Sequence, residues 1–144
     1  MIRFSFAVEI ERPVAEVWAY LIDPSHLPEW QSSCTAARRL DDGPMAAGAT
    51  IDDERRFMGR HVRSTVEVTE FEPERLFSLK GTSGPIPFEV RHSLEADDGR
   101  TRLTVEARGE PHGVSRFAAP IAARAAEHEF KRDFERLKAR LESA

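Results

Sequence analysis

The sequence predicts an α+β fold in which a series of short strands wraps one long helix at the end of the chain. The segment from Ala122 to Leu141 contains no Gly or Pro and is rich in strong helix formers. Before it, runs of alternating apolar and polar residues are separated by turn residues, which is typical of strands joined by hairpins. Because the strands and the helices are segregated along the chain, we expect an antiparallel sheet.

The second half of the predicted C-terminal helix carries one apolar stripe. Phe130, Phe134, Leu137 and Leu141 recur at spacings of four, three and four residues, which places them on one side of a helix. We interpret this stripe as ordinary core that packs against the sheet.

The first half of the same segment, from Val114, has a different pattern. A second apolar stripe with Phe117 and Ile121 points roughly the opposite way, and His128 lies on it. Pro120 lies between the two halves, so the regular helix either begins near this residue or bends there. A helix that is apolar on two sides needs two partners, of which the sheet is one. A ligand, a loop or a second subunit is the other.

The earlier elements follow from local patterns in chain order. Residues 2–10 alternate as a half-buried strand, and Pro13 suits the first turn of a helix that stops before Pro24. Residues 24–30 are expected to form a second short helix or turn. Further strands are predicted at 33–41, 51–58, 62–69, 76–80, 88–94 and 102–108, with turns at Gly59, 71–74, 81–87 and 97–99.

Length and composition exclude several classes of protein. We expect one domain over residues 1–144, without repeats or linkers. The net charge is −4 and the two signs are interspersed, so there is little support for nucleic-acid binding. The first ten residues do not read as a signal peptide, and no apolar run approaches the roughly 20 residues of a membrane span.

The cysteine and histidine content also limits the chemistry. The single Cys34 forms no disulfide within the chain, which indicates a reducing cytoplasm and excludes a zinc site built on cysteines. The five histidines are scattered without metal-ligand spacing. We therefore predict no metal and no cofactor.

Several short motifs, taken in order, resemble START-like (SRPBCC) proteins, and among them the polyketide cyclase/dehydrase and lipid-transport group. The resemblance covers essentially the whole chain, although Arg100 interrupts the Gly-Thr pair that is usual before the last strand. The residues that carry it are Pro13, Val17, Trp18, Leu21, Asp23, Pro28, Trp30, the hairpin Asp98–Gly99–Arg100–Thr101 and the helix end from Leu137 to Glu142.

The resemblance implies a helix-grip fold: a curved seven-stranded antiparallel sheet around a long C-terminal helix, with two short helices after the first strand. It also implies that a hydrophobic small molecule, such as a lipid, a polyketide or an aromatic compound, binds in the cavity between the sheet and that helix. The group shares no catalytic motif, so the resemblance transfers a fold and a mode of binding but no reaction.

Polar residues in the expected interior are the candidates for chemistry. His92 lies in the same row as Phe88 and Val90, where an imidazole acts as an acid or base, contacts a ligand, or serves as a hydrogen-bonded core residue. Asp53 and Arg55 share one face of their strand with Ile51 and Phe57; Glu54 and Arg56 share the other with Met58. Which pair points inward is open, because a slip of one residue exchanges the two faces.

Three functions follow from these patterns and remain open. The first is binding of an apolar ligand, and the predicted ligand-binding residues are Trp30, Phe57, Phe88, Val90, His92, Val105, Phe117 and Ile121. The second is a polyketide cyclase/dehydrase with His92, Asp53 and Arg55 as catalytic candidates. The third is an interaction module that uses the face around Phe117 and Ile121, with a homodimer as one form. The loop at residues 81–87 is a candidate gate to the cavity.

Overall fold

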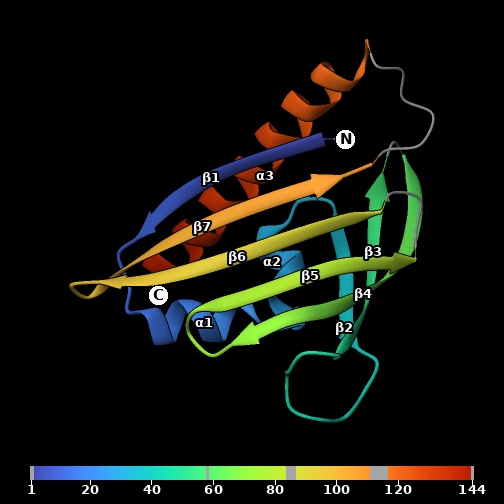
Figure 1. Cartoon of the computed structure of the whole chain (residues 1–144). Helices are drawn as coiled ribbons and strands as arrows, with labels where there is room; N and C mark the ends of the chain where they lie inside the picture. Colours follow the sequence, from blue (N-terminus) through green and yellow to red (C-terminus); the bar gives the residue numbers. More distant parts are fainter. Residues whose placement is uncertain (1, 58, 84–86, 111–116, 144) are drawn as a thin grey trace.

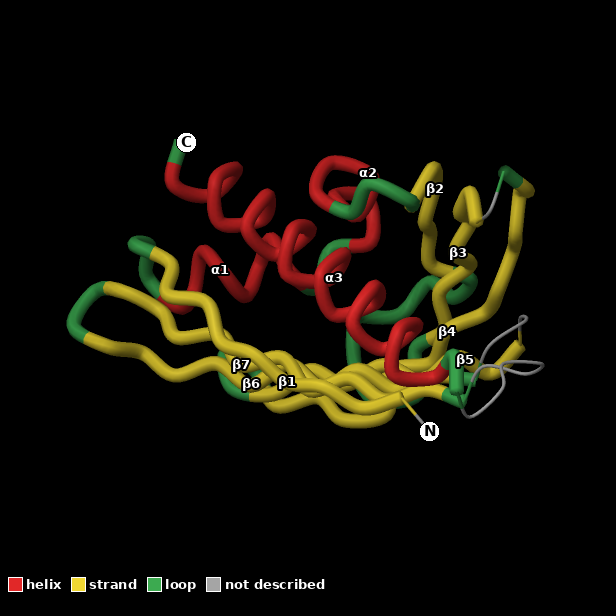
Figure 2. Tube along the Cα trace, turned by 90° about the horizontal axis from the view of Figure 1, so that it is seen from above, coloured by secondary structure: helices red, strands yellow, loops and turns green. Residues whose placement is uncertain are grey.

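The computed structural model describes residues 2–57, 59–83, 87–110 and 117–143. Seven antiparallel strands form one sheet in the order β1-β7-β6-β5-β4-β3-β2, which curves around a long helix (Figures 1 and 2). The strands are β1 (Ile2–Ile10), β2 (Cys34–Arg39), β3 (Thr50–Phe57), β4 (Arg60–Glu72), β5 (Leu76–Ser83), β6 (Phe88–Asp97) and β7 (Arg100–Gly109). The helices are α1 (Val14–Leu21), a 3₁₀ turn η1 (Pro24–His26), α2 (Leu27–Trp30) and α3 (Ala119–Glu142). The predicted α+β helix-grip fold is confirmed.

The two faces of the sheet differ in polarity, as expected for an antiparallel sheet with one covered side. On β7, Leu103, Val105 and Ala107 are buried and face the helix, whereas Arg102 and Glu106 are exposed on the opposite face. Ion pairs on that outer face join neighbouring strands through Glu9–Arg102 and Glu89–Arg108, and reach across β5 through Glu70–Arg91. The apolar core therefore lies on the concave side of the sheet.

A proline lies in the first turn of the long helix α3. Pro120 occupies the first turn, where its missing N–H costs no hydrogen bond, and the helix begins at Ala119, one residue before it. In the second half, Phe134, Leu137 and Leu141 are buried, which confirms the predicted stripe. The half-buried Phe130 lies edge-on to Phe4 of β1, with ring centroids 5.1 Å apart.

The two short helices support the bend of the sheet. α1 buries Val17, Trp18 and Leu21. The Trp18 ring packs on Phe71 and Phe77, at centroid distances of 5.3 and 6.1 Å. Trp18 is thus a core residue, and its packing joins α1 to strands β4 and β5.

One predicted loop is in part a strand. Residues 81–83 continue β5, and only part of the expected loop at 81–87 lies beyond it; residues 84–86 are outside the described ranges. The reason is the close approach of Phe88 to Gly81, because a Cβ at Gly81 would lie 2.6 Å from the Phe88 ring. Glycine inside a strand marks such an approach as readily as a turn. The predicted hairpin turn at Asp98–Gly99 is confirmed by positive φ angles of 54° and 84°.

Candidate functional site

His92 is a neutral histidine inside the apolar interior. It is 3% exposed, and its Nδ1 lies 2.8 Å from the carbonyl oxygen of Phe77. Since a carbonyl only accepts, Nδ1 carries the proton and donates it, which leaves a lone pair on Nε2. Burial lowers the pKa of His92 to about 4, so the ring is uncharged at neutral pH. Among the described residues the hydrogen bond of this ring is the one at Nδ1, and Nε2 is not one of the fully buried atoms that lack a partner.

Trp30 carries a buried polar atom beside the Phe134 ring. Trp30 is 1% exposed, and its Nε1–H has no hydrogen-bond partner within the described ranges of the chain. The ring centroids of Trp30 and Phe134 are 4.9 Å apart, and those of His92 and Phe134 are 5.7 Å apart. The interior between the sheet and α3 therefore holds one buried donor without a partner and a neutral imidazole whose Nε2 can accept a hydrogen bond.

The strand β3 settles which charged pair points inward. Asp53 and Arg55 share the buried face with Ile51, and Asp53 is 3% exposed. Arg55 donates from Nε to Asp53 Oδ2 at 2.7 Å and from Nη1 to Ser33 Oγ at 3.1 Å. Its Nη2 donates to Gln31. The guanidinium of Arg55 thus donates hydrogen bonds to three side chains near strands β2 and β3.

Cys34 belongs to the same cluster but is not a nucleophile. Its Sγ lies 3.5 Å from Asp53 Oδ1, and burial together with that carboxylate raises the pKa of Cys34 to about 12. Because the thiolate is the reactive form, this cysteine is inert at neutral pH.

Replacing Arg55 by methionine should lower the free energy of unfolding by about 2 kcal/mol. The change leaves the buried Asp53 carboxylate without its partner, and the effect falls below the about 3–5 kcal/mol of a fully buried pair because the Arg55 side chain is one-third exposed. Urea unfolding measures it. Arg56→Met, on the exposed face of the same strand, is the control and should change stability by less than about 0.5 kcal/mol. Equal effects of the two changes would contradict the inward placement of Arg55.

A buried aspartate on α3, Asp133, connects that helix to the α2–β2 turn. Its Oδ1 accepts hydrogen bonds from the backbone N–H and the hydroxyl of Ser32, both at 3.3 Å. Arg136 donates from Nη1 to Asp133 at 3.2 Å and to the carbonyl oxygen of Trp30 at 3.1 Å. Burial raises the pKa of Asp133. These contacts fix the backbone next to Trp30 and so help to position its side chain.

The structure brings some of the other predicted ligand-binding residues together and leaves two apart. Val90 and Val105 are buried on the inner face of the sheet, and Phe88 is half-buried beside Gly81. Phe117 and Ile121 are 84% and 73% exposed, so they do not join the interior. His128 is also outside it, on the half-exposed part of α3, and the side chain of Phe57 lies outside the described residues.

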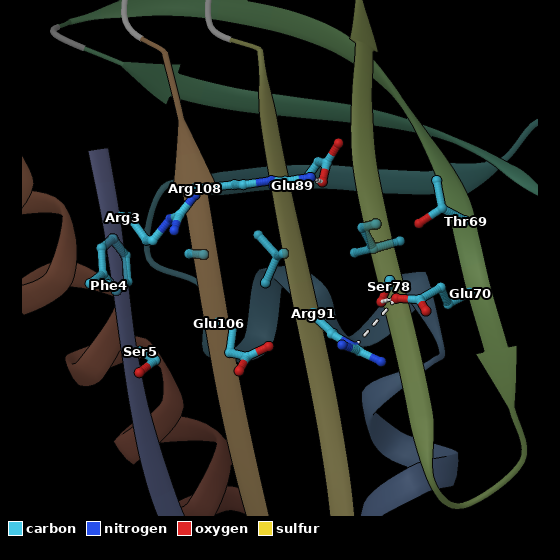
Figure 3. Close-up of a pocket in the computed structure, with 13 residues that line it drawn as sticks. Arg3, Phe4, Ser5, Thr69, Glu70, Ser78, Glu89, Arg91, Glu106 and Arg108 are labelled. Carbon is cyan, nitrogen blue, oxygen red and sulfur yellow. Dashed lines mark hydrogen bonds and ion pairs between the residues drawn. The ribbon is translucent and has the colours of Figure 1, made fainter. Parts of the chain in front are cut away.

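A groove of about 520 Å³ lies on the outer face of the sheet, away from the helices (Figure 3). One row of side chains crosses it from β1 to β4: Ser5, Glu106, Arg91, Ser78 and Glu70. The Ser78 hydroxyl donates to Glu70 at 2.7 Å, and Arg91 lies 3.4 Å from the same carboxylate. The charged, paired row differs from the apolar lining that the sequence predicts for the ligand site.

Within the described part of the chain, no group of three or more His, Cys, Asp or Glu side chains is arranged to hold a metal ion. Among those same residues, no helix has the length and hydrophobicity needed to cross a bilayer.

One known protein family matches nearly the whole chain. The family is described as polyketide cyclase/dehydrase and lipid transport, and it matches residues 1–142. The chain belongs to this family. A search of curated protein sequences finds no match. This member of the cyclase/dehydrase and lipid-transport family is also START-like in its three-dimensional structure.

Solved structures share the fold of this family member at low sequence identity. A START superfamily protein from Mycobacterium smegmatis has a TM-score of 0.85 at 15% identity, over 99% of both chains. A conserved protein from Geobacillus kaustophilus has a TM-score of 0.81 at 20% identity, over 99% of this chain and 96% of that one. The Zhui aromatase/cyclase from Streptomyces sp. R1128 has a TM-score of 0.78 at 16% identity, over 97% and 93%. At identities this low, the similarity to these structures shows a common fold only.

Proposed function

We propose that this chain binds a hydrophobic small molecule, a lipid, polyketide or aromatic compound, between the inner face of the sheet and α3. The observation that carries the proposal is the buried Nε1–H of Trp30, which has no hydrogen-bond partner among the described residues and lies beside the same Phe134 ring as the neutral His92. A polar atom without a partner in such surroundings costs free energy, and a ligand that supplies the partner removes that cost. The family description, which names both cyclases and lipid transport, is consistent with such a ligand.

These two side chains also define what the ligand should present. Nε2 of His92 accepts, so it matches a hydroxyl group, and Nε1 of Trp30 donates, so it matches a carbonyl or ether oxygen. Both lie beside the Phe134 ring, whose face suits a flat ligand. A largely apolar molecule with one hydroxyl group therefore fits better than a plain hydrocarbon.

Catalysis as a polyketide cyclase/dehydrase is the alternative. His92, Asp53 and Arg55 are its candidates, and one solved relative is an aromatase/cyclase. A base works best when its pKa lies near the working pH, and burial lowers that of His92 to about 4. The acceptor role of His92 in binding needs no such match, which favours binding over catalysis. The exposed Phe117 and Ile121 keep an interaction module as a third possibility.

Binding of 2-naphthol and of naphthalene, followed by fluorescence titration, tests the proposal. The wild-type protein should bind 2-naphthol about tenfold more tightly, because one hydrogen bond to a buried acceptor is worth about 1 kcal/mol or more. His92→Phe should remove this preference and retain naphthalene binding. Phe117→Ser, at an exposed site, is the control and should behave like the wild type. Equal affinity for the two probes, or a preference that survives His92→Phe, would overturn the proposal.

A further inference from the structure

The edge strand β1 is long, regular and unprotected. Its nine residues contain no Pro, Gly or Lys, and its pairing with β7 shows no bulge. Among the described residues, the backbone from Phe4 to Ile10 makes hydrogen bonds only to β7. Free N–H and C=O groups along such an edge are a template for another strand.

The opposite edge of the sheet is protected in the usual ways. β2 has only six residues, its register shifts between Cys34 and Ala36, and it ends in Arg38 and Arg39. Bulges, short length and charged residues each discourage pairing at an edge. Of the two edges, only β1 is therefore suited to accept a strand.

The sequence of β1 is complementary to itself in one antiparallel register. If a twofold axis passes through Phe6, Arg3 of one copy lies opposite Glu9 of the other, and Phe4 lies opposite Val8. The remaining pairs are Ile2 with Ile10, Ser5 with Ala7 and Phe6 with itself. Opposite charges that face each other across strands are stabilising, so the Arg3–Glu9 pair, formed twice, favours this register.

Neighbouring registers lose this complementarity. Moving the axis to Ser5 places Arg3 opposite Ala7, and moving it to Ala7 places Glu9 opposite Ser5. Phe4 and Phe6 are half-buried beneath Phe130 and Phe134 on the concave face, so a strand laid along the edge would cover more of both rings. Figure 2 shows α3 over this concave face and the β1 edge beside it.

We propose that β1 pairs with β1 of a second copy of this chain, antiparallel about Phe6, so that the two sheets become one. The Glu9 side chain is about half exposed even though its carboxylate bonds Arg102 at 2.9 Å, and a carboxylate accommodates a second cation. Arg3 lies opposite Arg108 of β7 in the monomer, and Arg108 is itself paired with Glu89. The interface is separate from the interior ligand site and does not depend on the proposed function.

Reversing the charge of Arg3 or of Glu9, and exchanging the two charges in a double variant, tests the proposed β1–β1 register directly. The full-length protein should show a concentration-dependent dimer in sedimentation velocity at low salt. Arg3→Glu and Glu9→Arg should each weaken it about tenfold, because two attractive pairs become repulsive. The double variant Arg3→Glu/Glu9→Arg should restore the affinity to within about threefold of the wild type, because both symmetric pairs reform with exchanged signs.

The controls separate this interface from a dimer that forms through another surface. Glu9→Arg also removes the pair with Arg102, which the double exchange does not rebuild, so restored dimerisation must come from the contact between copies. Phe117→Ser/Ile121→Ser alters the exposed face of the α3 region and should leave the dimer unchanged. Far-UV circular dichroism confirms that each variant is folded. A wild-type monomer at all concentrations, failure of the double exchange to restore the dimer, or loss of the dimer in the Phe117/Ile121 variant would overturn the proposal.

Discussion

Replacing Phe134 by alanine should lower the free energy of unfolding by about 4 kcal/mol, within the range seen for large aromatic core residues. Phe134 is buried at the centre of the interior. Its ring centroid lies 5.6 Å from that of Phe6, 4.9 Å from that of Trp30 and 5.7 Å from that of His92. Because these neighbours belong to β1, α2 and β6, the cavity left by alanine is bounded by separate elements and collapses poorly.

Urea unfolding followed by tryptophan fluorescence measures this change. Phe117→Ala removes the same atoms at an exposed position and should alter stability by less than about 0.5 kcal/mol. A loss of under about 1 kcal/mol at Phe134 would show that the ring is not the centre of the core. The Phe134→Ala variant should also accept larger aromatic probes, because the vacated space lies beside Trp30 and His92.

Stability should fall by about 3 kcal/mol as the pH drops from about 6.5 to about 4, through the single residue His92. Its pKa is about 4 in the folded protein, against about 6.5 in an unfolded chain. Between these values the unfolded state binds a proton that the folded state excludes, so acid favours unfolding. The contribution is fully present above pH 6.5 and is lost as the pH falls through the folded pKa.

The variant His92→Phe isolates this contribution. Asp52 and Glu29, whose pKa values are lowered by ion pairs and hydrogen bonds, and Asp133, whose pKa is raised by burial, titrate in both proteins and cancel in the comparison. Free energies of unfolding measured from about pH 7 to about pH 4 should therefore slope less steeply in the variant. Parallel curves would mean that the imidazole is charged or solvated in the folded state.

The fold was predictable because its signals are periodic. The four-three-four spacing from Phe130 to Leu141 and the alternation along residues 2–10 each correspond to one buried face, and the structure has both. The prediction from turn residues was wrong at one place. Gly81 and the residues after it were predicted to form a turn, whereas Gly81 lies within a strand and makes room for the Phe88 ring. A sequence alone does not distinguish these two uses of glycine.

The sequence indicated some of the polar residues of the candidate site, but not how they are arranged. His92 and the inward candidates at Asp53 and Arg55 were visible as polar residues within apolar patterns, yet the choice between Asp53–Arg55 and Glu54–Arg56 needed the strand register. Asp133 was missed because a charged residue on a helix usually lies on its solvent face, and its partner Ser32 lies about 100 positions earlier in the chain. Contacts of this range leave no local pattern.

The pairing of the first strand with the last has a consequence for synthesis on the ribosome. β1 cannot find its hydrogen-bonding partner until β7, about 100 residues later, has emerged, and α3, which fills the concave side, emerges last. Until then the apolar side of the earlier strands is exposed, in a topology dominated by distant contacts. The sheet is therefore completed only after β7 has been synthesised.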